Sequence, residues 1–352
     1  MSRRVDKRKL EAFLDKVVRE VGSAMSAALV LIGDQLGLWQ ALAHADGPLS
    51  PAELAARTET HERYIREWLD TMAAGGYVTY RDGRYQLEPE QAVALADSES
   101  AAFVPGIFQI TAAMWAAAPK IAANFRSGAG LDWDRHHPDL FEGTERFLRS
   151  EYLGRLVSSW LPALEGVVGK LERGARVADV GCGAGASTVI MARAFPASTF
   201  IGFDSRPGSV AAARRHADEA GVADRVTFEV ARAADFTGTD YDLIAQFDSF
   251  HGLEDPAAAA RHARGAIAPD GTWLLVEPFA ADRPELNHHA IGRMFYSCST
   301  FVSVPNALAR GGAALGAQVG ASALREQVVG GGWSRFRRAT TTAFHQVLEA
   351  RP

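Results

Sequence analysis

The sequence contains little cysteine and little surplus charge. Its two cysteines, Cys182 and Cys298, do not form pairs at metal-ligand spacing, so they imply neither a zinc site nor a disulfide framework. The formal net charge of −5 over 352 residues argues against a general binder of nucleic acids. Histidines adjoin at 136–137 and 288–289, but neighbouring side chains point in different directions, and no metal ion is expected.

A long apolar membrane segment and an apolar signal sequence are missing as well. Met1 is followed by charged residues, which favours a cytoplasmic protein without a membrane partner. The longest uncharged stretch, residues 100–119, has the length to span a bilayer. It contains Pro105, Gly106 and much alanine, and therefore a buried helix is the better interpretation.

The first ninety residues show a helix–helix–hairpin order. Apolar residues recur at helical spacing through 10–45, and Ser50 with Glu53 has the spacing of a capping box. Thr60 is expected to begin the next helix, which covers residues 61–74. Two short strand-like runs then flank an Asp-Gly turn at 82–83. This order is typical of a winged helix.

Charge decides how such a module is used. Residues 46–90 carry nine acidic and five basic side chains, a net charge of −4. That is the wrong sign for a surface that contacts phosphates. Packing or dimerisation is therefore preferred over DNA binding.

From residue 176 onward the pattern alternates between strands and helices. The predicted strands are 176–180, 199–204, 225–230, 241–247 and 271–277, and the predicted helices lie near 186–195, 208–220, 256–267 and 321–330. The last strand-like runs, 333–339 and 342–350, leave no room for a helix between them. They must pair as a hairpin, which adds an antiparallel strand to an otherwise parallel sheet.

A glycine-rich turn, Asp179-Val-Gly-Cys-Gly-Ala-Gly185, joins the first of these strands to the first of these helices. Such a turn lets backbone N–H groups approach a ligand at the positive end of a helix. Asp204 closes the next strand, nineteen residues after Gly185. About 20 residues is the spacing that brings a carboxylate to the hydroxyl pair of a ribose. The sequence therefore predicts a nucleoside-bearing cofactor.

Two cofactors fit this pattern. Gly181, Gly183 and Ala186 satisfy the G-x-G-x-x-A spacing of nicotinamide dinucleotide sites. S-adenosylmethionine is favoured by the third glycine, Gly185, and by Asp179, whose carboxylate can orient the turn and the amino end of the cofactor. The antiparallel hairpin, which a dinucleotide-binding sheet does not need, points the same way.

With these motifs the chain resembles the class I S-adenosylmethionine-dependent methyltransferases, and most of all the small-molecule enzymes with an N-terminal winged-helix dimerisation domain. The resemblance covers nearly the whole chain. It implies a Rossmann-like seven-stranded α/β sheet with an antiparallel last strand, preceded by a mostly helical domain. The expected domains are winged-helix 1–95, a helical linker and substrate lid 96–165, and cofactor-binding 166–352. A homodimer through the N-terminal helices is also expected.

The resemblance assigns the cofactor contacts. Gly181, Gly183 and Gly185 would flank the amino-acid part of S-adenosylmethionine, whose product is S-adenosyl-L-homocysteine. The remaining candidates are Asp179 for the amino end, Asp204 for the ribose, Ala233 for the adenine through its N–H, and Phe247. The family often has an acid before the adenine-binding residue, but here Arg232 stands there, and Asp235 is the candidate substitute.

The catalytic candidates follow the fourth strand of the alternating region, where α/β sheets place their sites. There the chain continues with Asp248 and His251. Imidazole can remove a proton near neutral pH, and the plant-type O-methyltransferases are similar in having a general-base histidine here. Glu277 matches an acid that brackets that base, whereas the second bracketing acid falls near the uncharged Gln318.

Several alternatives stay open. His251 can instead be a helix-start residue bonded to its own loop, and Glu277 can equally be a structural residue at a strand end. The preferred function is O-methylation of a small, aromatic or polyketide-like acceptor, with transfer to nitrogen or carbon less favoured. The alternatives are an NAD-dependent oxidoreductase, a ligand-sensing winged-helix DNA-binding regulator, and an inactive methyltransferase fold. Aromatic residues between 278 and 321 form either a substrate wall or ordinary core.

Overall fold

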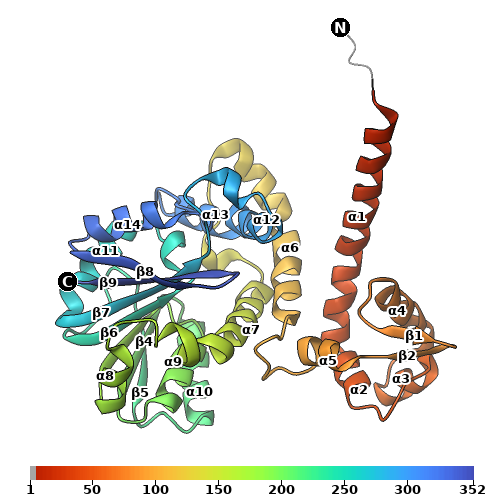
Figure 1. The fold of residues 1–352 in the computed structure, drawn as a ribbon, viewed down its shortest axis with the longest axis horizontal. Coiled ribbons are helices and arrows are strands. Elements are labelled where there is room, and N and C mark those ends of the chain that lie inside the picture. The colour runs from red at the N-terminus through yellow and green to blue at the C-terminus, as the bar shows by residue number, and fades with distance from the viewer. Residues whose placement is uncertain (1–4) are drawn as a thin grey trace. The chain divides into compact units, whose positions relative to one another are not determined.

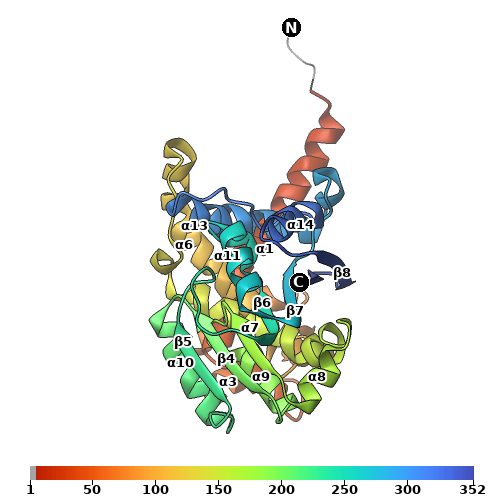
Figure 2. The same cartoon turned by 90° about the vertical axis from the view of Figure 1, so that its left-hand side faces the viewer.

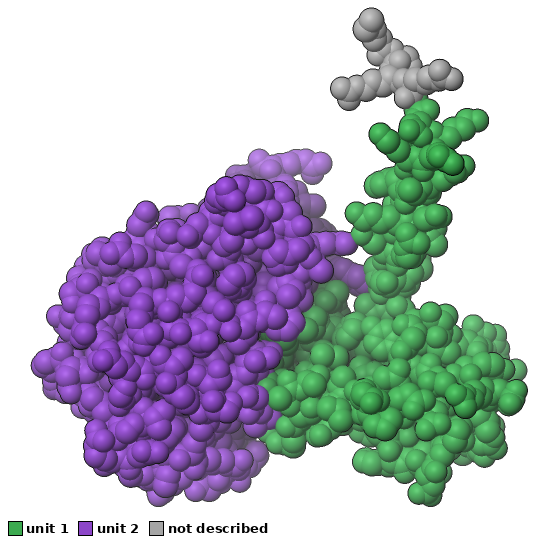
Figure 3. Space-filling view, in the orientation of Figure 1, with its two compact units in different colours: residues 1–112, 142–150 green, residues 113–141, 151–352 purple. Residues whose placement is uncertain are grey.

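The structure is a computed structural model that describes residues 5–352. These residues divide into two compact units (Figure 3). The smaller unit comprises residues 5–112 with 142–150, and the larger comprises 113–141 with 151–352. The domain boundaries expected at residues 95 and 165 stay predictions.

The smaller unit is built around five helices and a hairpin. These elements are α1 (Lys7–Gln35), α2 (Leu38–Ala43), α3 (Pro51–Arg57), α4 (Glu62–Ala74), β1 (Thr79–Arg81), β2 (Arg84–Gln86) and α5 (Pro89–Leu95). Trp39 and Trp68 pack with their ring centres 4.7 Å apart, and each indole N–H donates to a carbonyl near the end of α1. The helix–helix–hairpin order expected from the sequence is thus present.

The helix starts of this unit test two sequence expectations. The capping box at Ser50 and Glu53 is present, with each side chain accepting the other residue's backbone N–H. Thr60 does not cap α4. The cap is His61, whose Nδ1 accepts the N–H of Arg63 at 3.2 Å, so the expectation of Thr60 was wrong by one residue.

The larger unit contains, within residues 5–352, a seven-stranded sheet of order β5-β4-β3-β6-β7-β9-β8 (Figure 1). Its strands are β3 (Arg176–Val180), β4 (Thr199–Asp204), β5 (Val226–Val230), β6 (Tyr241–Phe247), β7 (Ile267–Pro278), β8 (Arg335–Thr341) and β9 (His345–Arg351). The first five are parallel, and β9 is antiparallel to both of its neighbours. The predicted fold class, a Rossmann-like sheet with an antiparallel last strand, is confirmed.

Helices cover both faces of this sheet (Figure 1 and Figure 2). One face carries α11 (Pro256–Ala266) and α14 (Ala321–Gly330), which enclose a core with Ala178, Ile244 and Leu275 of the central strands. The other face carries α8 (Val167–Arg173), α9 (Ala186–Ala194) and α10 (Pro207–Glu219). The central strands are therefore buried on both sides, as a parallel sheet requires.

The remaining helices lie outside the strand–helix alternation. Two of them, α6 (Pro105–Ser127) and α7 (Pro138–Arg155), are shared between the units, and the latter continues as a π-helical segment over Leu156–Trp160. Residues 290–309 form one helical run of α12 (Ala290–Cys298), a π-helical segment (Ser299–Ser303) and α13 (Val304–Ala309). Short π-helical segments often occur at functional sites. No helix within residues 5–352 has the length and hydropathy to cross a membrane.

Candidate active site

The glycine turn follows β3 as predicted and leads into α9. Gly181, Gly183 and Gly185 all have positive φ, at 75°, 56° and 82°. A Cβ at Gly185 would lie 2.9 Å from both Ala213 and Phe228, so close helix–strand packing requires glycine there. A Cβ at Gly183 would meet no atom within 4 Å, and so the backbone at this position is open to a ligand.

Asp179 lies beneath the turn and is fully buried. Its Oδ2 accepts hydrogen bonds from the hydroxyl groups of Ser187 and Thr188, both at 2.6 Å, whereas its Oδ1 has no partner. Burial raises the pKa of this carboxyl from 3.8 to about 6, against the opposing effect of the two hydroxyl donors. A buried carboxylate oxygen without a donor is costly, so this atom marks the position of a missing donor.

Asp204 ends β4, next to the turn. Its Oδ2 accepts the N–H of Gly183 at 3.0 Å, and its Oδ1 accepts the N–H of Arg206 at 2.9 Å. Burial raises the pKa of the Asp204 carboxyl above its usual value. Each carboxylate oxygen keeps a further lone pair, and so the group can accept two more hydrogen bonds from a ribose. The structure therefore brings together the turn and the acid that the sequence placed nineteen residues apart.

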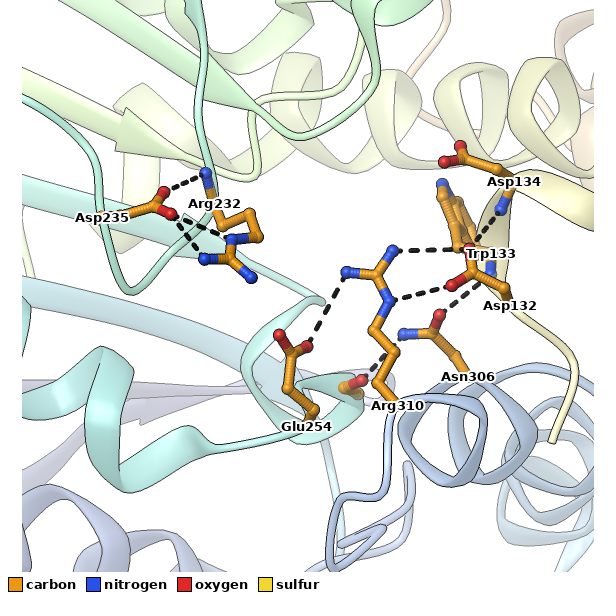
Figure 4. A network of polar contacts seen from close by, with 9 residues as sticks. Asp132, Trp133, Asp134, Arg232, Asp235, Glu254, Asn306 and Arg310 are labelled. Atoms are coloured by element: carbon orange, nitrogen blue, oxygen red, sulfur yellow. Dashed lines mark hydrogen bonds and ion pairs between the residues drawn. The ribbon is translucent and has the colours of Figure 1, made fainter. Parts of the chain in front are cut away.

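The predicted adenine contact lies after β5, in a turn at residues 233–235. Ala233 is half-buried and packs against the core. Asp235 accepts the backbone N–H of Arg232 with one oxygen and two guanidinium N–H groups with the other (Figure 4). Both oxygens of Asp235 are thus engaged by Arg232, and its predicted role toward adenine stays a prediction.

Phe247 and Asp248 lie at the end of β6. The Phe247 side chain is buried, with its ring centre 5.0 Å from that of Tyr152 and 6.2 Å from that of Trp160. Asp248 has a φ of 46°, which is uncommon for a residue other than glycine. Its carboxylate lies 3.0 Å from Nε2 of His345, in an ion pair without hydrogen-bond alignment.

His345 is a site residue that the sequence reasoning missed. It is fully buried at the start of β9, with Nδ1 3.6 Å from Glu151 and Nε2 facing Asp248. Burial opposes protonation, but the two carboxylates outweigh it and raise the pKa of His345 to about 9. Its partners lie almost 100 and 200 residues earlier in the chain, so no local pattern could have identified it.

His251 and Glu277 form a buried pair at the carboxyl ends of β6 and β7. Nδ1 of His251 lies 2.5 Å from Oε2 of Glu277, which also accepts the backbone N–H of His251 at 3.1 Å. Burial, the largest effect, lowers the pKa of His251, but the charge and hydrogen bond of Glu277 together raise it above its usual value. On the other side of the ring, Nε2 lies 3.1 Å from Oγ of Ser303.

Gln318, at the position expected for a second acid, makes its hydrogen bonds away from His251. Its amide nitrogen donates to the carbonyls of Phe279 and Ala317, and its oxygen is buried without a partner. Whether the missing second acid changes the orientation of the base stays a prediction. Among the described residues, Glu277 provides the carboxylate for Nδ1.

We call residues 128–136, between α6 and α7, the strap. Its residues Asp132 and Trp133 contact Arg310 and Asn306 (Figure 4). Arg310, directly after α13, binds Asp132 of the strap at 2.9 Å and lies 3.9 Å from Glu254. Asp134 of the strap pairs at 2.7 Å with Arg206, two residues after the ribose candidate. The strap therefore connects α13 with the end of β4.

The aromatic residues between 278 and 321 divide into two groups. Tyr296 of α12 and Phe301 of the π-helical segment line a groove of about 600 Å³, and Phe301 also packs against the buried cluster of Ala117, Ile121 and Leu131. Phe295 is buried instead. Phe295 thus belongs to the core, and a substrate wall formed by the other aromatic residues stays a prediction. Within residues 5–352 no three His, Cys, Asp or Glu side chains are grouped so that they could hold a metal ion.

Comparisons with known proteins concern the domains and the fold. Residues 171–306 match the family model described as a methyltransferase domain, and residues 24–97 match a winged helix-turn-helix domain model named after Rv2258c. The chain therefore carries a methyltransferase domain behind a winged helix domain. The resemblance stated from the sequence is confirmed, and a methyltransferase is supported over a nicotinamide-dependent enzyme.

The relative and the two solved structures that follow are all named as methyltransferases. A ubiquinone biosynthesis O-methyltransferase of Azorhizobium caulinodans is 30% identical over 105 residues, which are 29% of this chain and 40% of that protein. The chain thus spans about two fifths of the length of this curated relative. The solved mitomycin 7-O-methyltransferase MmcR has a TM-score of 0.73 at 20% identity, over 99% of this chain and 100% of its own. Human N-acetylserotonin methyltransferase, solved with S-adenosylmethionine, has a TM-score of 0.72 at 17% identity, over 100% and 99%. These solved structures establish the fold.

Proposed function

We propose that this protein transfers a methyl group from S-adenosylmethionine to a hydroxyl oxygen of a small, aromatic or polyketide-like molecule, with His251 as general base. One observation carries the proposal. A buried histidine is held by a buried carboxylate at the carboxyl end of β6, next to the strand that leads into the glycine turn. That edge of the sheet is where α/β proteins bind ligands.

The residues around the turn suit the cofactor. The unpartnered Oδ1 of Asp179 can accept from the ammonium group of its methionine part, and Asp204 can accept from its ribose hydroxyls. The open backbone at Gly183 allows close approach. When bound, S-adenosylmethionine supplies a methyl carbon on a sulfonium, whose carbon–sulfur bond breaks with the electron pair left on sulfur.

The protein's part is to position the acceptor and to take its proton. Glu277 accepts from Nδ1–H, which fixes the tautomer of His251 and leaves the Nε2 lone pair as the base. Glu277 also stabilises the imidazolium that forms when this nitrogen takes a proton. Asp248, the third catalytic candidate, faces Nε2 of His345, and its role in catalysis stays a prediction.

Calorimetric titration tests the cofactor. We expect binding of S-adenosylhomocysteine and none of NADH, and the reverse result would establish the oxidoreductase alternative. Transfer of a labelled methyl group from S-adenosylmethionine to a panel of phenols then tests the acceptor class. If the protein binds the cofactor but His251→Ala transfers the methyl group as fast as wild type, the base assignment is wrong.

We also propose a homodimer through α1. Apolar side chains of this helix are exposed at spacings of three, four and seven residues, namely Leu10 (46%), Leu14 (51%), Val18 (71%), Val21 (45%), Met25 (70%) and Ile32 (40%). Figure 3 shows α1 projecting from the body of its unit. Such a stripe is the seam of a helix pair, and a second copy offers a matching stripe. Light scattering should give twice the chain mass, and the paired change Val18→Glu with Met25→Glu should give the monomer.

The alternative of a DNA-binding regulator is weakened by the acidic winged helix, with its net charge of −4 over residues 46–90. It predicts duplex binding that falls steeply as salt rises. Fluorescence anisotropy with labelled duplex DNA measures this directly, and we expect no binding at physiological salt. The cytoplasmic location stays a prediction.

A further inference from the structure

Ser303 contacts Nε2 of His251, the nitrogen that the proposed reaction uses as the base. Its Oγ lies 3.1 Å from Nε2, and both side chains are nearly buried, with 7% of Ser303 and 6% of His251 exposed. Ser303 is the last residue of the π-helical segment in the 290–309 run. It lies 52 positions after His251 in the sequence, outside every motif considered above.

The donor in each contact depends on which ring nitrogen of His251 carries a hydrogen. Where the Glu277 carboxylate accepts, Nδ1 of His251 carries the hydrogen. In the neutral ring Nε2 then has a lone pair and no hydrogen. In this neutral tautomer the hydroxyl of Ser303 donates to Nε2 and occupies the lone pair that the base would use.

The contact is held in place by a neighbouring residue. Asn306, one turn after Ser303, donates to the carbonyl of Gly252 at 2.9 Å. Its side-chain oxygen accepts the N–H of Trp133 in the strap, also at 2.9 Å (Figure 4). Asn306 thus ties the helix that carries Ser303 to the turn that carries His251. A shift of this helix away from His251 would break these bonds.

We propose that Ser303 relays the proton from the acceptor hydroxyl to His251. This inference rests on the proposed function. The acceptor oxygen gives its proton to Oγ of Ser303 while the Ser303 proton passes to Nε2. The net change is one proton moved from acceptor to imidazole, with the serine regenerated. The acceptor oxygen keeps the electron pair of its broken O–H bond and uses it to bond the methyl carbon.

A serine–histidine–carboxylate series also occurs in hydrolases, where the serine attacks a carbonyl. That chemistry needs backbone N–H donors aimed at an oxyanion. Ser303 lies inside a continuous helical run, whose N–H groups are used within the helix. The relay is therefore the function that suits this serine.

The test compares two acceptors that differ in acidity, 1-naphthol and 4-nitro-1-naphthol, at a pH where the second is already ionised. A relay matters only when a proton must be removed. Ser303→Ala should therefore lower kcat with 1-naphthol by about 100-fold, the low end for positioned proton transfer, and leave kcat with the ionised acceptor near wild type. Equal loss with both acceptors, or no loss with either, would overturn the relay.

Ser299→Ala is the matched control. Ser299 is also 7% exposed in the same π-helical segment, but its Oγ accepts from the N–H of Ala317 instead of contacting His251. This variant should act on both acceptors like wild type. If it instead reproduced the selective loss seen with Ser303→Ala, the relay would be refuted.

A second measurement does not depend on turnover. In protein labelled with ¹⁵N-histidine and mixed with S-adenosylhomocysteine, Ser303→Ala should shift the Nε2 resonance of His251 toward that of a nitrogen without a donor. An unchanged resonance would refute the hydrogen bond and the relay. A wild-type protein that binds no S-adenosylhomocysteine overturns the proposed function and the relay with it. Loss of the relay alone leaves the methyltransferase proposal intact.

Discussion

Replacing Asp179 with asparagine should keep or raise the stability of the free protein while it weakens binding of the cofactor. The carboxyl of Asp179 is fully buried, and burial raises its pKa from 3.8 to about 6. Each pKa unit corresponds to about 1.4 kcal/mol, so holding the charge at neutral pH costs the free protein about 3 kcal/mol. The protein tolerates this cost where, by our proposal, the charge meets the ammonium group of the cofactor.

The direction in which stability changes with pH follows from proton binding at the Asp179 carboxyl. Between pH 3.8 and about 6 the folded protein binds more protons at this carboxyl than the unfolded chain does, so its contribution to stability falls as pH rises and stays low above about 6. An asparagine in place of this acid has no charge to bury, and this part of the pH dependence should disappear. The amide NH₂ of the new side chain, at the position of the unpartnered Oδ1, costs about 1–3 kcal/mol if it finds no acceptor.

We therefore expect Asp179→Asn to unfold in urea at pH 7 with a free energy between that of wild type and about 2 kcal/mol above it. Affinity for S-adenosylhomocysteine should fall by about 10- to 100-fold, the loss of a hydrogen bond to a charged group. Denaturation at several pH values and calorimetric titration measure the two effects. A variant that is several kcal/mol less stable, or one that binds the cofactor like wild type, would show that the orphaned oxygen is not a ligand position.

Three further predictions concern the catalytic side of the site. His251→Ala should lower kcat by about 10²- to 10⁴-fold with little change in calorimetric cofactor affinity, and comparable turnover in both proteins would remove the general base. Glu277→Gln removes the charge that raises the pKa of His251, so the acid limb of the pH profile of kcat/KM should move to lower pH. An unmoved limb would show that Glu277 does not raise the pKa of the catalytic base. His345, with its pKa raised to about 9, stabilises the fold by roughly 3 kcal/mol below pH 6.5 and loses this effect as pH rises through 9. His345→Gln should therefore flatten the fall in unfolding free energy at alkaline pH, measured by urea denaturation. A fall as steep as in wild type would contradict the ion pairs of His345 with Glu151 and Asp248.

Much of the fold was predictable because its signals are local. The strand before the glycine turn, the turn itself and the helix after it are consecutive, so one stretch of sequence specifies all three. The terminal hairpin followed from the short connection between two strand-like runs, and it became β8 and β9. Boundaries were less certain. The strand expected over 271–277 extends to Ile267, because its pairing with β6 continues past a register shift near Tyr241.

Among the cofactor candidates, spacing alone brought Asp204 to the turn, because a βαβ unit of that length has little freedom. The acidic winged helix and the apolar pattern of α1 were equally visible in the sequence. These local patterns specify the backbone around the glycine turn and Asp204, and the types of residue placed along it.

The catalytic side was decided by the tertiary structure. Glu277, Ser303 and His345 lie 26, 52 and 94 residues after His251, on three different elements. Which of them contacts the imidazole depends on the order of strands in the sheet and on the packing of the 290–309 run against it. Those contacts form only when distant segments bury their apolar faces together, and no periodicity within one segment records them.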